Sequence, residues 1–533
     1  MSDQSPVVRD QSPVSSSPKR RRWRVSRRGF LIGAGVTGVG LALGVTLGKP
    51  FVHLKVAEML DSGGAPGGGY DTSPWAWFEV LEDSRIRLFV PKVEMGQGVH
   101  TSLAQVAVEE LGIAWDDLDV MQATTHVGPA DDFGTAGSTS VSGTYASIRQ
   151  TAATLREMLR AAAAEQLGQP LENIEIDGRG FAVAGAADQR IDLYPLVASK
   201  RDWDVPEDPP ALKAVSDFTV IGQPLPRKDI PAKVTGQAIY GYDMRVDGMK
   251  YGAIARPPTI EGKLTAAAAG DAATQPGVHT VVIEEDFAGV VADSRAAART
   301  ALGSLQLTWD EGKRWQQEEL EQIVTVGASG GITIQKEGNA AGILENGTTL
   351  TAEYRSPFAV QTPLEAQAAL ADVQGDSARV WVSTQMQGRT RSIIAETLGM
   401  DEANVEVIPT YLGGGFGRKA GFEVAVEAAR LSKAAGVPVH VGWDRTEELR
   451  YGYFRPPTHH VLAAKLRDDG AIEAFQHQQA SGDVAFGFLP GFLQVVMGAD
   501  FGATRAARVP YAIPHLQTVA HRTPLPVRTG WWR

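Results

Sequence analysis

Residues 413–419 read Gly413-Gly414-Gly415-Phe416-Gly417-Arg418-Lys419, and this stretch decides how the rest of the chain is interpreted. Its three consecutive glycines leave no side chain at three positions, so a planar or phosphorylated ligand can lie directly against backbone N–H groups. The stretch follows a predicted strand at residues 405–408 and precedes a predicted helix at residues 421–435. A tight turn between a strand and a helix requires the same glycines. Taken by itself, the glycine loop (Gly413–Gly417) is compatible with a structural turn and with a binding site.

A second glycine-containing loop lies near the start of the predicted folded region. Residues 78–90 alternate apolar and polar side chains and predict one or two strands, and Met95-Gly96-Gln97-Gly98 follows them. A helix is predicted at residues 100–111, with an apolar stripe along one face. Small residues suit the entry to a helix, but the same arrangement places the Gln97 amide where it can bond a ring nitrogen or carbonyl of a ligand. Both interpretations stay open at this point.

A third loop is rich in small hydroxyl side chains. It reads Gly137-Ser138-Thr139-Ser140-Val141-Ser142-Gly143 and precedes a helix predicted at residues 145–167. Hydroxyl and backbone N–H groups at the N-terminus of a helix form a site for phosphate or pyrophosphate. Ser and Thr also ordinarily cap helices, so this Ser/Thr loop (Gly137–Gly143) has two interpretations of equal weight.

The composition describes a globular protein and excludes one class of partner. The chain has 533 residues, of which 43% are hydrophobic and 21% charged, which is enough for three or four domains. Its net charge is −11, but residues 1–28 carry eight Lys or Arg against two Asp, so the remainder carries −17. A body this acidic repels phosphate backbones, and we expect no nucleic-acid partner.

The absence of cysteine limits the metal chemistry. With no cysteine, the chain can form no disulfide and can ligate no iron–sulfur cluster or thiolate zinc site. Its ten histidines show no ligand spacing. We therefore expect no metal ligand from the protein's own side chains, and any metal must be held by an organic cofactor.

The N-terminus predicts an export signal. Ser26-Arg27-Arg28-Gly29-Phe30-Leu31 matches the twin-arginine pattern, and the uncharged residues 29–48 follow its two arginines. This pattern predicts a periplasmic protein. Residues 29–48 are also long enough to span a bilayer, so an uncleaved membrane anchor is the alternative. Residues 33–38 satisfy the GxGxxG pattern, but no predicted strand precedes them, which argues against a dinucleotide-binding fold there.

Together these motifs resemble a known family. The stretch from Thr384-Gln385 through the glycine loop, with the Met95–Gly98 loop and the Ser/Thr loop, is similar to the molybdenum-binding large subunits of the xanthine dehydrogenase and aldehyde oxidase family. The segment at residues 227–238 resembles the start of that family's small α/β hammerhead domain. Because the Met95–Gly98 loop precedes that segment, the order resembles the branch that contains the isoquinoline 1-oxidoreductase beta subunits. The resemblance covers residues 75–533.

The resemblance implies an α+β fold, in which molybdenum-binding domains of the xanthine dehydrogenase type accompany a small α/β hammerhead domain. Strands of the hammerhead domain are expected at residues 240–243, 251–256 and 305–309. The expected division is a twin-arginine signal region at 1–50, a Gly-rich linker at 61–74, a molybdopterin-binding segment with the Met95–Gly98 and Ser/Thr loops at 75–215, the hammerhead domain at 218–315, and a molybdopterin-binding domain with the glycine loop, incomplete at its C-terminus, at 340–533.

The resemblance also assigns residue roles. Gln385 matches the glutamine whose amide contacts an oxo ligand of molybdenum, and this is the catalytic role that it assigns in this chain. Ala420 stands where xanthine-oxidising relatives carry a substrate-binding glutamate, which argues against purines, and Gln361 leaves the specificity open. Arg445 and Arg455 are expected to be buried ion-pair partners. The residues expected to bind the cofactor are Gly96, Gln97, Gly98, Ser138, Thr139, Ser140, Gln385, Gly414, Gly415, Phe416, Gly417 and Arg533.

The activity that the resemblance implies is oxidative hydroxylation of an N-heteroaromatic (isoquinoline-like) or aldehyde substrate, with water as the source of oxygen. The implied cofactor is molybdopterin cytosine dinucleotide carrying molybdenum. The implied partners are a small [2Fe-2S] subunit, which would hold the clusters that a cysteine-free chain cannot, and an electron acceptor such as a cytochrome.

The C-terminus sets the alternatives to an enzyme. The chain stops at Arg533, within a motif that matches a cofactor loop, and contains no Gly-x-Gly-Glu, the motif that carries the family's general base. We therefore expect the 533-residue chain to be truncated and inactive by itself. The alternatives are a non-catalytic periplasmic scaffold that binds the cofactor, a truncated remnant, and a membrane-anchored subunit that docks an electron acceptor.

Overall fold

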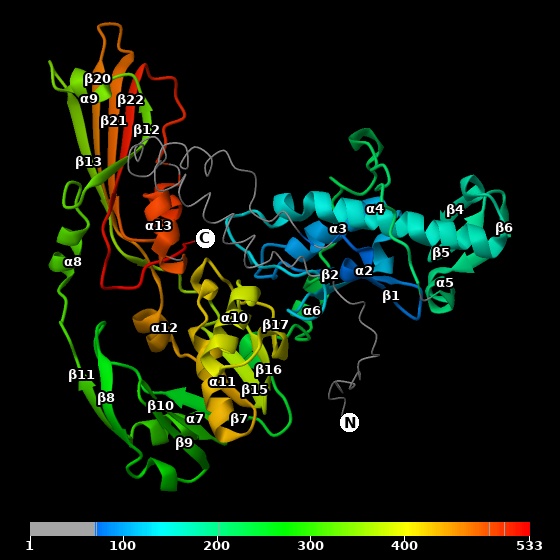
Figure 1. The fold of residues 1–533 in the computed structure, drawn as a ribbon, viewed down its shortest axis with the longest axis horizontal. Coiled ribbons are helices and arrows are strands. Elements are labelled where there is room, and N and C mark those ends of the chain that lie inside the picture. The colour runs from blue at the N-terminus through cyan, green and yellow to red at the C-terminus, as the bar shows by residue number, and fades with distance from the viewer. Residues whose placement is uncertain (1–69, 71, 201, 490, 506, 533) are drawn as a thin grey trace, which may run out of the picture.

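The structure of the chain is a computed structural model. It describes residue 70 and residues 72–532, apart from 201, 490 and 506. The expected signal region, most of the expected linker and Arg533 lie outside the described residues. Figure 1 shows three bodies that follow one another along the chain, an N-terminal body of helices and strands, a central sheet with helices, and a C-terminal sheet. This mixture of helices and sheets confirms the predicted α+β class.

The N-terminal body packs two long helices against a small sheet (Figure 1, blue and cyan). Its elements are α2 (Pro74–Trp77), β1 (Phe78–Val80), β2 (Ile86–Val90), α3 (Val99–Leu111), β3 (Leu118–Gln122), α4 (Ser140–Leu167), β4 (Ile174–Asp177), β5 (Gly180–Val183), β6 (Ala186–Asp192) and α5 (Leu193–Ser199). Strand β2 pairs with β1 antiparallel and with β3 parallel, so α3 is the crossover between two parallel strands.

The core of this body lies between α3 and α4. The apolar stripe predicted for α3 faces inward, and Leu103 and Leu111 are buried with Ile148 and Leu155 of α4 in one cluster. The prediction of a helix at residues 100–111 is therefore confirmed. Helix α4 begins at Ser140, five residues before the predicted start, so part of the Ser/Thr loop is helical.

The central body is a seven-stranded sheet in the order β17-β16-β15-β18-β7-β10-β9. Its strands are β7 (Lys250–Ile254), β9 (Val278–Glu284), β10 (Phe287–Ala292), β15 (Ala368–Gln374), β16 (Ser377–Val382), β17 (Val405–Pro409) and β18 (Val439–Gly442), and its helices are α7 (Arg295–Leu302), α10 (Gln387–Leu398) and α11 (Glu423–Ala435). Buried Ala425, Ala428 and Ala429 line α11, and these small side chains bring the helix close to the sheet. Strands from the expected hammerhead segment and from the glycine-loop segment thus share one sheet.

The expected strand at residues 240–243 is wrong. Gly241–Asp243 forms a 3-10 helix, because the Asp243 carboxylate accepts the Tyr240 N–H at 3.1 Å and closes a turn. The strands expected at 251–256 and 305–309 are confirmed by β7 and by β11 (Gln306–Asp310). Short elements complete this part of the chain: α6 (Ile230–Val234), β8 (Lys263–Ala268), β11 (Gln306–Asp310), α8 (Gln317–Ile323) and α12 (Arg445–Tyr451).

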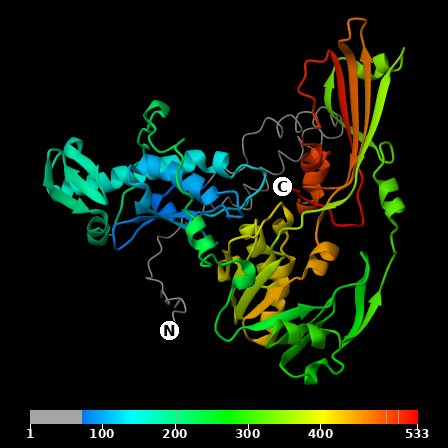
Figure 2. The same ribbon diagram turned by 180° about the vertical axis from the view of Figure 1, so that it is seen from behind.

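The C-terminal body is a five-stranded sheet in the order β12-β22-β21-β20-β13, which stands at one end of the molecule in both ribbon views (Figures 1 and 2). Its elements are β12 (Gly331–Glu337), α9 (Ala340–Leu344), β13 (Leu350–Ser356), β20 (Thr458–Leu466), β21 (Ile472–Ser481), α13 (Gly491–Met497), α14 (Phe501–Thr504) and β22 (His515–Arg522), and the pair β14 (Ala359–Val360) and β19 (Phe454–Arg455) joins it to the central body. Within the described residues, no helix is both long enough and apolar enough to cross a membrane.

Candidate cofactor-binding site

The glycine loop lies between β17 and a 3-10 helix, Arg418–Ala420, that leads into α11. Gly414 and Gly417 have φ angles of 91° and 83°, a left-handed conformation that glycine adopts without strain. Phe416 also has a positive φ, of 53°, and its side chain is exposed. These angles turn the backbone so sharply that the N–H after the loop, that of Arg418, donates back to the Gly415 carbonyl at 2.8 Å.

The N–H groups of the glycine loop fall into two sets. The Gly413 N–H donates to the Glu365 carboxylate at 2.9 Å, and the Gly417 N–H donates to the side-chain oxygen of Gln385 at 3.0 Å. Among the described residues, the three N–H groups between them, at positions 414–416, have no hydrogen-bond partner. Buried N–H groups are almost always paired in folded proteins, and Gly415 is buried. Successive unpaired N–H groups of this kind form a concave site for an acceptor-rich ligand.

Gln385 connects the glycine loop to the N-terminal body. It follows β16, and only 2% of its surface is exposed. Its backbone N–H donates to the Lys419 carbonyl and its backbone carbonyl accepts from the Thr135 N–H, both at 2.8 Å. Its side-chain Nε2 donates to the Thr135 carbonyl, also at 2.8 Å. Because an amide nitrogen carries two hydrogens, one N–H of this buried side chain is left for a ligand.

The Met95–Gly98 loop approaches the glycine loop from the N-terminal body. The Leu412 N–H donates to the Glu94 carbonyl at 3.1 Å. A methyl group added to Gly415 would lie 2.5 Å from the Met95 sulfur and 2.7 Å from the Gln385 side-chain oxygen. Side chains do not approach one another so closely, so glycine at position 415 is what allows these groups to meet. The structure therefore brings together Gln385 and two of the three loops that the sequence singled out.

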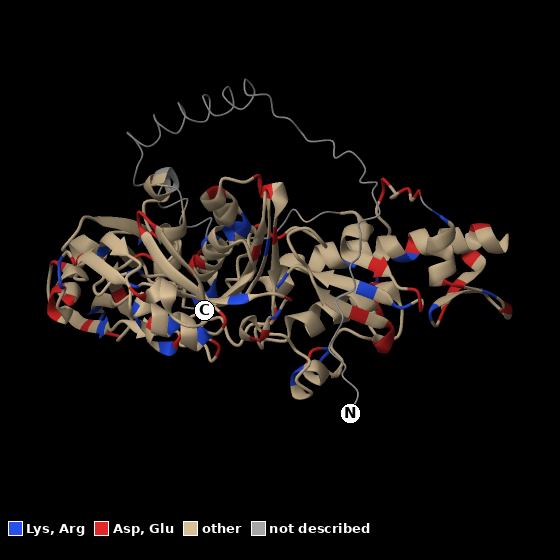
Figure 3. Cartoon of the chain, turned by 90° about the horizontal axis from the view of Figure 1, so that it is seen from below, with Lys and Arg blue, Asp and Glu red and all other residues tan. Residues whose placement is uncertain are grey.

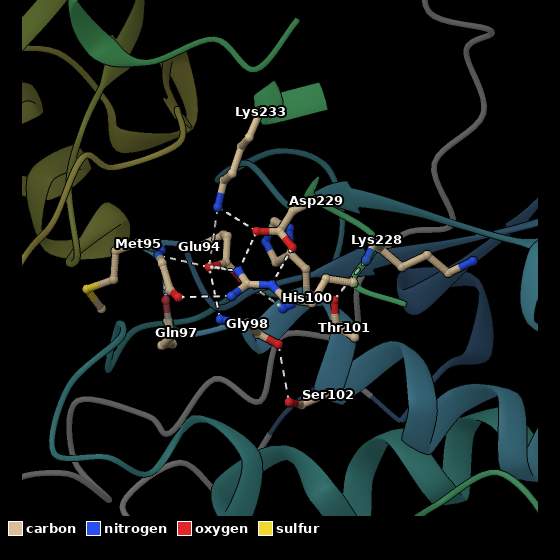
Figure 4. A network of polar contacts seen from close by, with 12 residues as sticks. Glu94, Met95, Gln97, Gly98, His100, Thr101, Ser102, Lys228, Asp229 and Lys233 are labelled. Atoms are coloured by element: carbon tan, nitrogen blue, oxygen red, sulfur yellow. Dashed lines mark hydrogen bonds and ion pairs between the residues drawn. The ribbon is translucent and has the colours of Figure 1, made fainter. Parts of the chain in front are cut away.

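The Glu94 carboxylate fixes the shape of the Met95–Gly98 loop (Figure 4). It accepts the N–H groups of Gly96 at 2.9 Å, Gly98 at 3.0 Å and His100 at 3.3 Å, and its side chain is fully buried. These three bonds draw the loop backbone around one carboxylate. The loop is consequently held in place by the protein itself.

The Gln97 amide closes this loop on itself. Its oxygen accepts from the Met95 N–H at 2.8 Å, and its nitrogen donates to the Val93 carbonyl at 2.9 Å. The side chain is exposed, and its second N–H is not used by these bonds. A contact between Gln97 and a ligand stays a prediction.

Sequence reasoning missed the charged residues that compensate Glu94. Arg227 and Lys233 lie 3.4 and 3.8 Å from the Glu94 carboxylate, and both also pair with Asp229, at 2.6 and 2.5 Å (Figure 4). Burial alone would raise the pKa of Asp229, but hydrogen bonds and attraction from the two cations outweigh it and lower that pKa to about 2. The signal that could have found them is the density of charge in residues 227–233.

The Ser/Thr loop begins two residues after Thr135. Ser138 is exposed and has a φ of 59°. The Thr139 hydroxyl donates to the Ala136 carbonyl at 3.0 Å, and no side chain caps α4. The first N–H groups of this 28-residue helix therefore lack a side-chain acceptor, which leaves the helix N-terminus able to bind an anion.

The C-terminal segment reaches the glycine loop. A methyl group added to Gly417 would lie 2.5 Å from the Trp531 Cβ atom. The Gln361 side chain donates to the Trp531 carbonyl at 2.6 Å. Arg533, the last residue expected to bind the cofactor, lies outside the described residues.

Two buried ion pairs brace the end of the glycine loop. Arg418 pairs with Glu448 at 2.6 Å, and Lys419 pairs with Glu365 at 2.5 Å. Burial lowers the pKa of Lys419, and the attraction of Glu365 opposes that shift. Because Glu365 also accepts the Gly413 N–H, this pair ties both ends of the loop to one carboxylate.

The ion-pair roles expected for Arg445 and Arg455 are wrong. Arg445 donates to the Leu364 carbonyl at 2.9 Å, and Arg455 donates to the Pro357 carbonyl at 3.1 Å. Neither arginine contacts a carboxylate within the part of the chain that the structure describes. The spacing of arginines after the loop could not reveal this, because their partners are backbone oxygens.

These donors fit a planar cofactor with ring acceptors and phosphate oxygens. The loop N–H groups and the free N–H of Gln385 suit ring oxygens and nitrogens, and the uncapped N-terminus of α4 suits phosphate. Within the described residues, no group of three or more His, Cys, Asp or Glu side chains is placed to hold a metal ion.

Comparisons with known proteins agree with this fit. Two models of a molybdopterin cofactor-binding domain match residues 16–248 and 324–523. The chain is 30% identical to the B subunit of nicotinate dehydrogenase from Pseudomonas putida over 85% of this chain and 39% of that protein. It is 29% identical to the beta subunit of isoquinoline 1-oxidoreductase from Brevundimonas diminuta over 94% of this chain and 70% of that protein. Among solved structures, quinoline 2-oxidoreductase from Pseudomonas putida 86 is matched with a TM-score of 0.48 and 19% identity, over 59% of this chain and 46% of that one.

The chain belongs to the xanthine dehydrogenase family of molybdopterin-binding subunits, because both cofactor-binding domain models match it and they frame the loops described above. One model covers the Met95–Gly98 and Ser/Thr loops, and the other covers Gln385 and the glycine loop. The candidate site therefore lies where the two matched regions meet.

Proposed function

We propose that this chain is the molybdopterin-binding subunit of an oxidoreductase that hydroxylates an N-heteroaromatic compound or an aldehyde. The observation that carries the proposal is the row of unpaired N–H groups at positions 414–416, which lies against Gln385 and Met95 where the two matched regions meet. The names of the relatives support the substrate class, because they include a nicotinate dehydrogenase, an isoquinoline oxidoreductase and a membrane-bound aldehyde dehydrogenase.

The chain's own residues would bind and orient the reacting groups. When bound, a molybdenum–pterin cofactor supplies oxidative hydroxylation with water as the oxygen source. Gln385 would donate its remaining N–H to an acceptor on that cofactor, and the Thr135 carbonyl would keep the amide from rotating. A neutral donor suits this place because it stabilises an oxygen acceptor without giving up a proton.

The test of this assignment is the variant Gln385→Met, with Gln374→Met at an exposed strand end as the matched control. Loss of one hydrogen bond in a buried site costs about 1–3 kcal/mol, or roughly tenfold to a hundredfold in rate. In the intact, assembled enzyme, the variant should keep its molybdenum content, measured by mass spectrometry of the metal, and reduce a tetrazolium dye tenfold to a hundredfold more slowly. Wild-type turnover of the variant with full metal content would show that Gln385 does not act in the site.

We also propose the cytosine dinucleotide form of the cofactor and a small [2Fe-2S] partner subunit. The uncapped N-terminus of α4 would accept the dinucleotide's phosphates. A partner would carry the clusters, because these 533 residues contain no cysteine and relatives are named as subunits. An electron acceptor such as a cytochrome would take the electrons from these clusters. Release and mass analysis of the bound nucleotide would separate the cytosine form from others.

A further part of the proposal is export to the periplasm by the twin-arginine route. It rests on Arg27 and Arg28 and on the uncharged residues 29–48, which would also serve as a membrane anchor if left uncleaved. Changing both arginines to lysine should leave the protein in the cytoplasm. Normal periplasmic or membrane levels of that double variant, judged by fractionation and immunoblotting, would refute the route.

A further inference from the structure

A cavity borders the candidate site. It has a volume of about 460 Å³. It is lined by side chains of strands β20 and β21 and by residues within 501–507 and 530–532. Trp531, which packs against Gly417, forms part of its wall, and so does Gly137 of the Ser/Thr loop. The volume suits a compound of one or two rings.

The ionisable side chains that line this cavity are all basic residues. Arg455, Arg505, His460 and His477 contribute to its wall, and no Asp or Glu of the described residues does. The chain as a whole has a net charge of −11, and acidic and basic residues are both spread along the described part of the chain (Figure 3). A cavity without carboxylates is therefore unusual for this protein.

Another cavity has the opposite character. It measures about 580 Å³ and lies between α8, α12 and residues 526–528. Two of its three arginines meet carboxylates of the protein, since Arg256 pairs with Glu427 and Arg528 pairs with Glu423. Those pairs compensate charge inside the cavity and leave little attraction for an anion.

The two histidines of the smaller cavity are neutral. His460 Nδ1 lies 2.9 Å from His477 Nε2, and His477 Nδ1 lies 3.2 Å from the Ala507 carbonyl. A carbonyl only accepts, so His477 donates from Nδ1 and accepts at Nε2 from His460. His460 then accepts at its Nε2 from the Thr458 hydroxyl at 3.0 Å. Burial lowers the pKa of both rings, that of His460 to about 4, so the positive charge of the cavity comes from its arginines.

Both arginines keep donors for a ligand. Arg455 donates to the Pro357 carbonyl, and its buried Nε atom has no partner among the described residues. Arg505 is exposed and makes no hydrogen bond or ion pair with the described part of the chain. A guanidinium group binds a carboxylate through two parallel N–H donors. Trp531 and Phe501, whose rings are 6.0 Å apart and tilted by 54° to each other, supply apolar ring faces in the same wall.

We propose that this cavity binds a planar aromatic carboxylate, with Arg455 and Arg505 pairing with the carboxylate and Trp531 contacting the ring. The inference rests on the proposed function, in that the ligand would be the substrate of that reaction. It narrows the substrate class from N-heteroaromatics and aldehydes in general to aromatic compounds that carry an acid group. Because Trp531 lies beside the glycine loop, a ligand ring that contacts Trp531 would lie next to that loop.

The test uses the full chain as purified and measures binding rather than turnover. Benzoate and its neutral isostere benzamide are titrated by calorimetry. We expect benzoate to bind at least tenfold more tightly than benzamide. Arg505→Gln should weaken benzoate tenfold to a hundredfold and leave benzamide unchanged, whereas Arg467→Gln, at the exposed turn after β20, should change neither. Arg455→Lys, which keeps the charge, should retain part of the affinity that Arg455→Gln loses.

Three outcomes would overturn the inference. They are equal binding of benzoate and benzamide, benzoate binding that the Arg505 and Arg455 variants leave intact, and displacement of benzoate by pyrophosphate at lower concentrations than benzoate itself requires. The last outcome would assign the anion site to the cofactor's phosphates. Molybdenum content is measured in the same preparations, so a chain that contains the metal but ignores benzoate refutes this inference alone. A chain that never acquires the metal refutes the proposed function whatever benzoate does.

Discussion

Replacing Gly415 with alanine tests whether the glycine loop and Gln385 are as close as the structure shows. The added methyl group would lie 2.7 Å from the Gln385 side-chain oxygen, and contacts under 3.0 Å essentially never occur. The amide must therefore move by a few tenths of an ångström, and the 3.0 Å bond from the Gly417 N–H would leave the normal range. The Met95 sulfur, at 2.5 Å, is the more adaptable neighbour because it ends a flexible side chain.

The magnitude follows from the hydrogen bond that is lost. Leaving a buried donor unpaired costs about 1–3 kcal/mol, and a cost near 2 kcal/mol makes local opening roughly thirtyfold more frequent. Hydrogen–deuterium exchange of the Gly417 amide should accelerate by about that factor. The Thr135 amide, which donates to the Gln385 backbone carbonyl, should change much less.

Two controls make the result specific. Gly330→Ala adds a methyl group at a position with no atom within 4 Å and should leave exchange at Gly417 unchanged. Combining Gly415→Ala with Met95→Ala removes the sulfur contact but leaves the contact with Gln385, so fast exchange should persist. Unchanged exchange at Gly417 in the single variant, or full recovery in the double variant, would refute the assignment of Gln385 as the obstructing group.

Two further predictions concern stability. Glu94→Gln should lower the thermal unfolding midpoint, because a single amide oxygen cannot accept all three N–H groups that the carboxylate accepts, and a buried donor left unpaired costs about 1–3 kcal/mol. A midpoint equal to that of the wild type would show that the loop does not need the carboxylate. His440, fully buried beside the Gly241 carbonyl at 2.9 Å, has its pKa lowered by burial to about 4. The unfolded chain therefore binds the extra proton first, so stability falls as pH drops from about 6.5 to 4, by up to about 3 kcal/mol for this group. In the His440→Gln variant, the urea concentration at the unfolding midpoint should depend less on pH over that range. A pH dependence equal to that of the wild type would contradict the assignment.

The sequence predicted local structure better than it predicted contacts. The helix at residues 100–111 and the strand before the glycine loop were found because periodicity and glycine placement are local signals. The closeness of the Met95–Gly98 loop to the glycine loop could be expected only through resemblance to a family, since no local pattern reports contacts over such separations. The conformation of the Gln97 amide and the pairing of Arg227 with Glu94 were out of reach, because each depends on which backbone or charge lies nearby after folding.

The error over Arg445 and Arg455 has the same cause. An arginine in a sequence indicates a positive charge and five N–H donors. Whether these donors meet a carboxylate or a backbone carbonyl depends on packing. The expected strand at residues 240–243 failed for a more local reason, since one aspartate side chain was enough to close a turn.

The bonds that Gln385 makes to Thr135 have a consequence for the order in which the molecule is built. They join residues 250 positions apart, and the bond from Leu412 to Glu94 joins residues separated still further. Contacts between such distant parts of a chain form late, because the long loop between them must first lose conformational entropy on closing. The N-terminal helices can assemble from neighbouring residues as soon as they leave the ribosome, whereas the wall around the glycine loop must wait for residues 385–531. A nascent chain would thus expose its unpaired loop donors until the residues that pack against the glycine loop have been translated and folded.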